Sequence, residues 1–257
     1  LTEYASTGQQ TREGEDAAGT VVSAFERASA GDGSWGNAGG TLRYRRQYEG
    51  DQHDLTLALT YDRQWSDLGT QATINFVVPM PPPLYELIGS ESVTNTTRLT
   101  IDYNRPLPGD QRLKVGADFK FSDKGFDFRG ERGAGAGSTV VDPALTNRFL
   151  YGLNTQAVYF TYQRPIGPVN AQLGLRVEAD QEDVNQVTSG LFVRKVSTGL
   201  YPTLHLQYEL TDTQEITGSY SRRIQRPGPG ALNPYVIYID PFNQRAGNPY
   251  LRPEVTD

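Results

Sequence analysis

Hydrophobic and polar residues alternate one by one along several stretches of the chain. In the clearest stretch, Leu55, Leu57, Leu59 and Tyr61 are separated by single polar or small residues. The same period of two recurs over residues 41–48, 98–104, 112–121, 151–163, 169–178, 203–210 and 215–221. A period of two predicts β-strands that have one apolar and one polar face. The chain is therefore expected to contain about eight or nine strands.

The connections between these strands alternate between short and long, the long ones spanning residues 66–97, 122–150, 181–199 and 223–254. The expected strands have about 9–12 residues, close to the roughly 9–11 that cross a membrane. Outer-membrane barrels combine such strands with short turns on one side and long loops on the other. The predicted fold class is all-β: an antiparallel, up-and-down transmembrane β-barrel segment over residues 41–257, preceded by a polar loop or poorly ordered segment over residues 1–40.

Hydrogen bonding explains why this pattern suits a barrel. Inside hydrocarbon every backbone N–H and C=O group needs a partner within the protein, and a closed antiparallel sheet provides one for each group without exposed edges. The apolar residues then face lipid, and the polar residues face a wet lumen. The expected lumen side carries both signs of charge, at Arg43, Arg45, Asp54, Asp62, Asp102, Lys114, Asp118, Arg176 and Glu178.

Alternation alone also fits a soluble sheet whose apolar face points inward. The two interpretations place Leu57, Leu173 and Leu206 differently. A membrane barrel turns these residues outward, whereas a soluble sheet gathers them in a sealed dry interior. Strand length and the rhythm of the connections favour the membrane barrel.

Composition removes several functional classes. The chain has 257 residues, with 24 Lys and Arg against 30 Asp and Glu, which gives a net charge of -6. An acidic chain without a basic run argues against nucleic-acid binding. The chain has no Cys, and its two histidines, His53 and His205, lack companion ligands at metal-binding spacing. We therefore expect no metal site, no cofactor and no catalytic residue, and a protein that is not an enzyme.

The last part of the chain carries a run of short motifs. A segment ending in Ser219-Tyr220-Ser221-Arg222-Arg223 is followed by Arg226-Pro227, by Leu232-Asn233-Pro234, and by Gly247-Asn248-Pro249, Leu251, Pro253 and Glu254. This run resembles the barrel domain of TonB-dependent outer-membrane receptors. The resemblance is specific over residues 150–257 and is one of strand style over residues 1–149.

The resemblance implies a location in the cell outer membrane of a Gram-negative bacterium and a barrel of about 22 strands. It also implies a plug domain, which this sequence does not contain, and the TonB energy-coupling complex as a partner, in addition to outer-membrane lipid. The chain then corresponds to a middle-to-late segment of the barrel. The implied function is uptake of a scarce small-molecule or glycan ligand, such as a ferric siderophore, cobalamin or an oligosaccharide, without chemistry on it.

Arginines in the expected loops are the candidate ligand-binding residues: Arg222, Arg223, Arg226, Arg129 and Arg132. The cluster of the first three either pairs with carboxylates of the lumen, the interpretation we favour, or binds an anionic ligand. Other functions remain open at this point. They are a smaller passive porin-like barrel, an enzyme anchored on such a barrel, and a soluble secreted β-rich binding module.

Overall fold

The computed structural model describes residues 2–78, 81–211, 213–240 and 243–257 and consists largely of long antiparallel strands. The long strands are β1 (Thr2–Glu15), β2 (Val21–Gln47), β3 (Asp54–Val78), β4 (Leu84–Leu107), β5 (Gln111–Gly133), β7 (Asn147–Ile166), β8 (Val169–Gln186), β9 (Leu191–Thr211) and β10 (Gln214–Ser221). The short elements are β6 (Val140–Val141), the 3-10 helix η1 (Pro143–Leu145), β11 (Arg223–Gln225), α1 (Pro229–Leu232), β12 (Ile237–Asp240), β13 (Asn243–Arg245) and β14 (Glu254–Thr256). Neither helix in the described ranges has the length and apolar character needed to cross a membrane.

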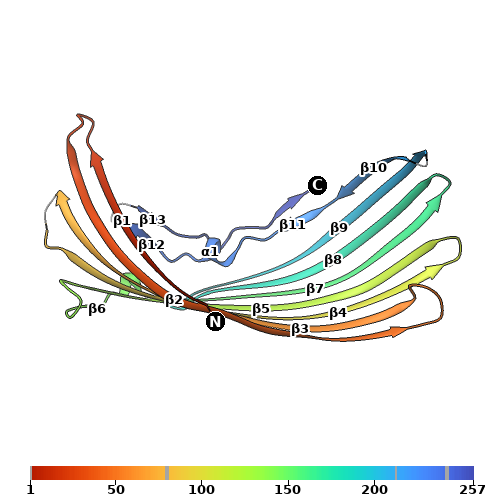
Figure 1. The fold of residues 1–257 in the computed structure, drawn as a ribbon, viewed down its shortest axis with the longest axis horizontal. Helices are drawn as coiled ribbons and strands as arrows, with labels where there is room; N and C mark the ends of the chain where they lie inside the picture. Colours follow the sequence, from red (N-terminus) through yellow and green to blue (C-terminus); the bar gives the residue numbers. More distant parts are fainter. Residues whose placement is uncertain (1, 79–80, 212, 241–242) are drawn as a thin grey trace.

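Each long strand pairs with its sequence neighbour, so the sheet has up-and-down topology. Within the described residues, ten strands form one sheet in the order β1-β2-β3-β4-β5-β7-β8-β9-β10, with β6 paired to β5 off this path. The sheet curves into a trough, and the elements that follow β10 lie in its concave side (Figure 1). This architecture confirms the predicted class, an antiparallel segment of an up-and-down barrel.

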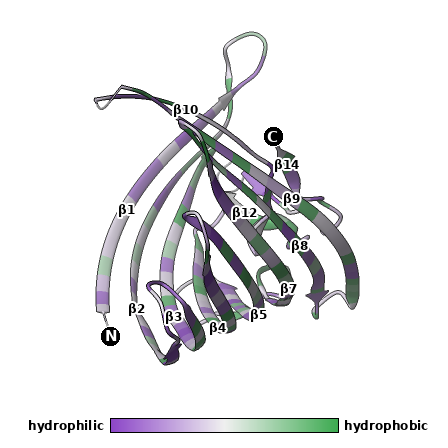
Figure 2. Cartoon of the chain, turned by 90° about the vertical axis from the view of Figure 1, so that its right-hand side faces the viewer, coloured by the Kyte–Doolittle hydropathy of each residue, from purple (hydrophilic) through white to green (hydrophobic). Residues whose placement is uncertain are grey.

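In the segments where hydrophobic and polar residues alternate, apolar side chains face outward and charged side chains face the concave side. Leu173 and Leu206 are 50% and 42% exposed, whereas Asp118 and Glu178 are 5% and 6% exposed. Hydropathy alternates along the strands accordingly (Figure 2). This distribution is the reverse of a soluble sheet with a dry core, and it confirms that the polar face lines the inside.

The register joins the outward apolar residues of neighbouring strands into one band. Residues that lie directly opposite each other include the pairs Leu57 and Ile101, Leu99 and Phe119, Val115 and Phe160, Val158 and Val177, and Leu173 and Leu204. In β5 the outward apolar positions run from Leu113 to Phe121, and the next outward residue is Asp123. Eight residue steps span about 27 Å along a strand. For tilted strands this length matches an apolar band about 25 Å tall.

The strands extend well beyond this band, which corrects the predicted loops over 66–97 and 181–199 and the two ends of the loop over 122–150. The sequence predicts loops over 66–97, 122–150, 181–199 and 223–254. The structure instead continues β3 to Val78 and begins β4 at Leu84, and it joins β8 to β9 through residues 187–190. Above the band the outward face becomes mostly polar, so the hydrophobic period that lipid imposes disappears there while the backbone ladder continues. Residues 79–80 and 241–242 of the predicted loops lie outside the described residues.

The N-terminal region is also more ordered than the sequence predicts. Residues 1–40 are predicted as a polar loop or poorly ordered segment, but β1 and most of β2 lie there, and β1 pairs with β2 from Thr2 opposite Trp35 onward. Gly, Ser and Ala dominate this region and give little hydrophobic alternation. Backbone pairing with β3 then determines the strand, for example Ser34 opposite Asp67.

Candidate functional site

The chain segment that follows β10 docks on the inner wall formed by β7 and β8. We call residues 226–235 together with residues 247–251 the docked segment. It contains α1 and most of the motif residues that carry the resemblance. The docked segment lies inside the trough, on its concave side (Figure 1).

Arg226 ties the docked segment to buried carboxylates of β8. Its guanidinium contacts Glu178, and its Nη2 and Nε donate to Oδ2 of Asp180 at 2.6 and 3.2 Å. Asp180 also accepts from the Thr155 hydroxyl of β7 at 2.7 Å. The sequence left two roles open for Arg226, pairing with lumen carboxylates or binding an anionic ligand. In the structure Arg226 pairs with lumen carboxylates.

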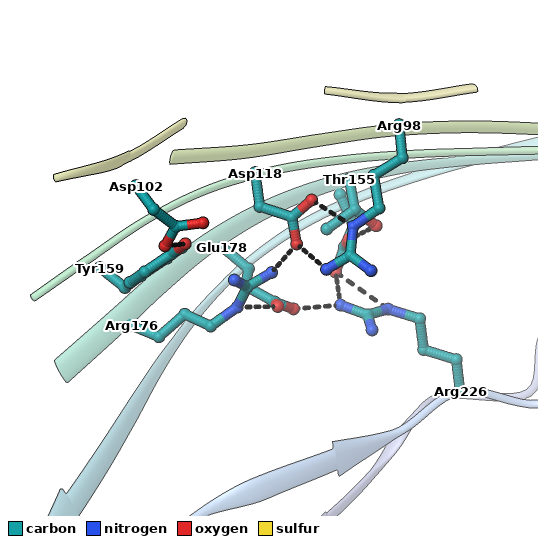
Figure 3. A network of polar contacts seen from close by, with 9 residues as sticks. Arg98, Asp102, Asp118, Thr155, Tyr159, Arg176, Glu178 and Arg226 are labelled. Carbon is teal, nitrogen blue, oxygen red and sulfur yellow. Dashed lines mark hydrogen bonds and ion pairs between the residues drawn. The ribbon is translucent and has the colours of Figure 1, made fainter. Parts of the chain in front are cut away.

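The same carboxylates belong to a larger charge network that crosses four strands (Figure 3). Arg176 of β8 donates to Glu178 at 2.6 Å and to Asp118 of β5 at 3.1 Å. Arg98 of β4 donates to both carboxylate oxygens of Asp118 at 2.8 Å. Side chains that start on separate strands meet because inward residues of adjacent strands lie side by side in the register. The result is a charged wall whose cations and carboxylates compensate one another.

Leu232 docks on an apolar patch that lies higher on the wall. Leu232 is fully buried against Phe149 and Tyr151 of β7 and Val184 of β8. The Tyr151 hydroxyl donates to Glu182 at 3.0 Å, and burial together with this carboxylate raises the pKa of Tyr151. The apolar rings and the hydroxyl therefore each have a partner suited to them.

The remaining motif residues hold the docked segment together. The N–H of Gly247 donates to the carbonyl of Asn233 at 2.7 Å, and the N–H of Asn248 donates to that of Ala231 at 2.8 Å. A Cβ atom on Gly247 would lie 2.5 Å from the Ala231 carbonyl oxygen and 2.7 Å from that of Asn233. A side chain does not fit at this distance, so glycine is required where the two halves of the docked segment meet.

Further contacts spread the docking over the wall. The Tyr235 hydroxyl donates to the carbonyl of Ala144 at 2.8 Å, and the Tyr235 ring stacks on Phe128 of β5 with centroids 6.4 Å apart. Lys195 of β9 donates to the carbonyl of Leu251 at 3.0 Å. The docked segment therefore touches β5, β7, β8 and β9 rather than a single strand.

The other candidate ligand-binding arginines do not gather in one place. Arg222 pairs with Asp257 at 2.6 Å, and Arg223 donates to the Ser221 hydroxyl at 3.2 Å. Arg132 bridges Glu86 and Asp142, at 2.9 and 3.0 Å, near the end of β5. The prediction that these arginines contact a ligand stays a prediction.

Arg129 lies near Arg132 in sequence but on the opposite face of β5. It is mostly exposed and pairs with Glu131 at 3.2 Å. The Thr139 hydroxyl and Arg129 together hold the pKa of Glu131 below its usual range. A residue on this outward side lies away from the lumen, which makes Arg129 the weakest of the five as a contact for a ligand inside the barrel.

A second concentration of charge lies near the short turns at the opposite end of the inner wall. A cavity of about 540 Å³ there is lined by Arg45, Gln52, Asp54, Asn104, Arg105, Pro106, Arg112, Leu113, Lys114, Thr161, Gln163 and Gln172. Asn104 donates to Asp54 at 2.8 Å, and Lys114 pairs with Asp102 at 3.1 Å. These pairs confirm that the predicted lumen charges share one face.

The polar side chains of the inner wall are largely engaged in ion pairs and hydrogen bonds with one another. Within the described ranges, no group of three or more His, Asp or Glu side chains is placed to hold a metal ion. The sequence analysis did not single out Phe149, Tyr151, Asp180 or Val184. These residues occupy every second position of β7 and β8, on the inward side, above the lipid-facing band. Apolar and charged residues share this inner face, and that alternation could have identified them.

The fold and the two-faced wall define an outer-membrane type of β-barrel. A family model described as the outer membrane protein beta-barrel family matches residues 46–257, and the chain belongs to this family. The family places the chain in the outer membrane of a Gram-negative bacterium and confirms the outer-membrane barrel that the sequence predicts.

Two solved structures resemble the chain in fold. One is the ferric citrate transporter FecA in its unliganded form, at 13% identity and a TM-score of 0.43, covering 86% of this chain and 42% of that one. The other is the ferric yersiniabactin uptake receptor FyuA from Yersinia pestis, at 10% identity and a TM-score of 0.37, covering 87% and 42%. The chain spans less than half the length of either protein. No curated protein matches its sequence significantly.

Proposed function

We propose that this chain forms part of the barrel wall of an energy-coupled outer-membrane receptor that imports a scarce ligand without chemical change. The observation that carries the proposal is the docked segment. The residues on which the resemblance to TonB-dependent receptors rests, including Arg226, Leu232 and Gly247, are the residues that place this segment on the inner wall. These motif residues shape the inside of the barrel, which is where a ligand would pass in a transport protein.

The chemistry of the wall supports transport over catalysis. Membership of an outer-membrane barrel family supports a role in passage across the outer membrane. The inner face carries compensated ion pairs such as Arg98 with Asp118 and Arg176 with Glu178. Paired charges with fixed geometry bind and orient polar groups, whereas acid–base catalysis needs a group free to exchange a proton.

The proposed partners are a plug domain of the same protein and the TonB complex of the inner membrane. The proposed ligand is a ferric siderophore, cobalamin or an oligosaccharide. The two solved structures that resemble the chain in fold are a ferric citrate transporter and a ferric yersiniabactin uptake receptor, so an iron chelate is the first probe for a binding test.

The test uses the full-length protein from outer membranes and needs no knowledge of the ligand. The purified protein is mixed with the periplasmic domain of TonB, and its conductance is recorded in planar bilayers. We expect TonB binding and no steady conductance. Steady conductance without TonB binding would show a passive porin, and recovery in the soluble fraction without detergent would contradict a membrane barrel.

The ligand class is then tested by uptake. Cells with and without the gene receive radiolabelled ferric citrate, a ferric catecholate, cyanocobalamin or a maltooligosaccharide, before and after collapse of the proton gradient. We expect gene-dependent uptake of one probe that stops with the gradient. Gene-dependent uptake that continues without the gradient would contradict energy coupling.

A further inference from the structure

The inner wall contains a buried carboxylate whose cationic partner belongs to the docked segment. Asp180 is 7% exposed and accepts from Thr155 within the wall. Its cationic partner among the described residues is Arg226. A carboxylate so far removed from water is costly without a compensating charge. Undocking the segment would therefore break this ion pair and leave Asp180 of β8 without its cationic partner.

The wall also contains an apolar patch that the docked segment covers. Phe149 and Val184 are fully buried in a face that is otherwise rich in charge, and Leu232 lies on them. Removing Leu232 from the patch would expose apolar surface to a wet lumen, at a cost proportional to the area uncovered. The apolar contact and the ion pair are separate interactions that favour the same docked position.

The docked segment is closed on itself at the same point. The hydrogen bonds from Gly247 and Asn248 back to Asn233 and Ala231 join its two halves, so an anchor on one half restrains the other. These hydrogen bonds couple the two halves, so we expect the loss of one anchor to loosen both of them.

We propose that Arg226 and Leu232 are positioning residues that make the docked segment a fixed part of the barrel wall rather than a moving loop. The segment then narrows the lumen permanently, and opening of the passage takes place in other parts of the protein. This inference concerns the resting barrel and holds whether or not import is coupled to TonB.

Amide hydrogen exchange on the full-length protein in outer-membrane vesicles measures how often the docked segment opens. Peptides that cover the segment are compared with peptides from β7 and β8 of the same molecule. We expect the segment to exchange nearly as slowly as these strands. Exchange as fast as that of the exposed turn 187–190 would overturn the proposal.

The charge anchor is tested with a matched pair of variants. Arg226→Glu places a negative charge beside Asp180 and should speed exchange in the docked segment at least about tenfold, because a lost buried pair is worth more than one factor of ten. Arg223→Glu makes the same charge change three residues away, where the arginine contacts Ser221. It should leave the segment unchanged. Equal effects of both variants would show a general charge effect and contradict a specific anchor.

Two further variants distinguish positioning from simple loss of contact. Arg226→Lys keeps the charge but has one donor group in place of the two that Arg226 uses, so it should restore most of the protection. Exchanging the partners, with Arg226→Glu and Asp180→Arg together, should restore part of it. If neither variant protects the docked segment from exchange better than Arg226→Glu alone does, Arg226 is not an ion-pair anchor.

A glycine pair keeps the proposal testable if the charge variants fail to fold. Gly247→Ala forces a Cβ against the Ala231 carbonyl and should accelerate exchange about tenfold. Gly228→Ala is the control, because a Cβ there meets nothing within 4 Å in the described part of the chain. Unchanged exchange in Gly247→Ala, or acceleration in Gly228→Ala as well, would contradict the closed and anchored segment.

Discussion

The two faces of the same strands differ in what they bury. On the outer face of β8, Leu173 is half exposed and lies within a continuous apolar band. On the inner face of the same strand, Glu178 and Asp180 are almost fully buried within a network of arginines. One step along the chain therefore changes the surroundings from hydrocarbon to ion pairs.

This difference shows that each face follows the solvent that it meets. Lipid accepts exposed apolar side chains without cost, and a wet lumen accepts charges that are paired. A substitution should therefore be judged by the face on which it falls rather than by its burial. A half-exposed leucine is the sensitive position here, because its exposure is to lipid.

The largest expected effect comes from placing a charge on the lipid-facing side. Leu206→Arg puts a guanidinium near the middle of the apolar band of β9 and should cost about 2–4 kcal/mol of unfolding free energy. The neighbouring residue His205 faces inward, so His205→Arg should change stability by less than about 0.5 kcal/mol. Reversible denaturant unfolding of the full-length protein in phospholipid vesicles measures both. Equal costs would contradict the assignment of faces.

A smaller effect is expected from breaking the inner charge network. Asp118→Asn weakens the contacts to Arg98 and Arg176 and should cost about 2 kcal/mol, because the half-exposed Arg98 and the more buried Arg176 lose a shared, nearly buried carboxylate. Its control is Asp127→Asn on the outward face above the band, where Asp127 is half exposed and lies 3.7 Å from Arg148. The control should cause no measurable change. A larger loss from Asp127→Asn than from Asp118→Asn would reverse the comparison.

The smallest effect concerns pH and an outward ion pair above the band. Hydrogen bonds from Arg194, at 2.7 and 2.9 Å, hold the pKa of Asp183 below its ordinary value. A lowered folded-state pKa means that the stabilisation is complete above about pH 4 and is lost as the pH falls through that pKa. The stability difference between wild type and Asp183→Asn should therefore shrink between about pH 6 and pH 3. A difference that stays constant or grows on acidification would show that the pair does not stabilise the fold.

The strands inside the apolar band were predictable from sequence because lipid imposes the strict period of two. Leu55, Leu57 and Leu59 show this period, and they lie in β3 as expected. Above the band neither face meets lipid, so residues such as Ser66 and Ser92 pair across strands without any hydrophobic signal. The long loops were therefore predicted wrongly in the regions where the physical cause of the pattern is missing.

The docked segment was only partly predictable. Its motif residues were visible as a resemblance, and pairing of Arg226 with lumen carboxylates was the favoured interpretation. Its partners Asp180 and Phe149 were not predicted, because they lie far away in sequence and are brought together by the register of β7 and β8. One sequence contains no direct signal for such a contact.

On β8, Leu173 faces lipid and its neighbour Gln172 faces the lumen. The most direct test places a fluorescent thiol label on Leu173→Cys and on Gln172→Cys, in the full-length protein in vesicles whose acyl chains carry bromine. We expect bromine to quench the label strongly at position 173 and little at position 172. A water-soluble quencher should act in the opposite order. A label at position 173 that is protected from both quenchers would place that residue in a dry interior and contradict the account.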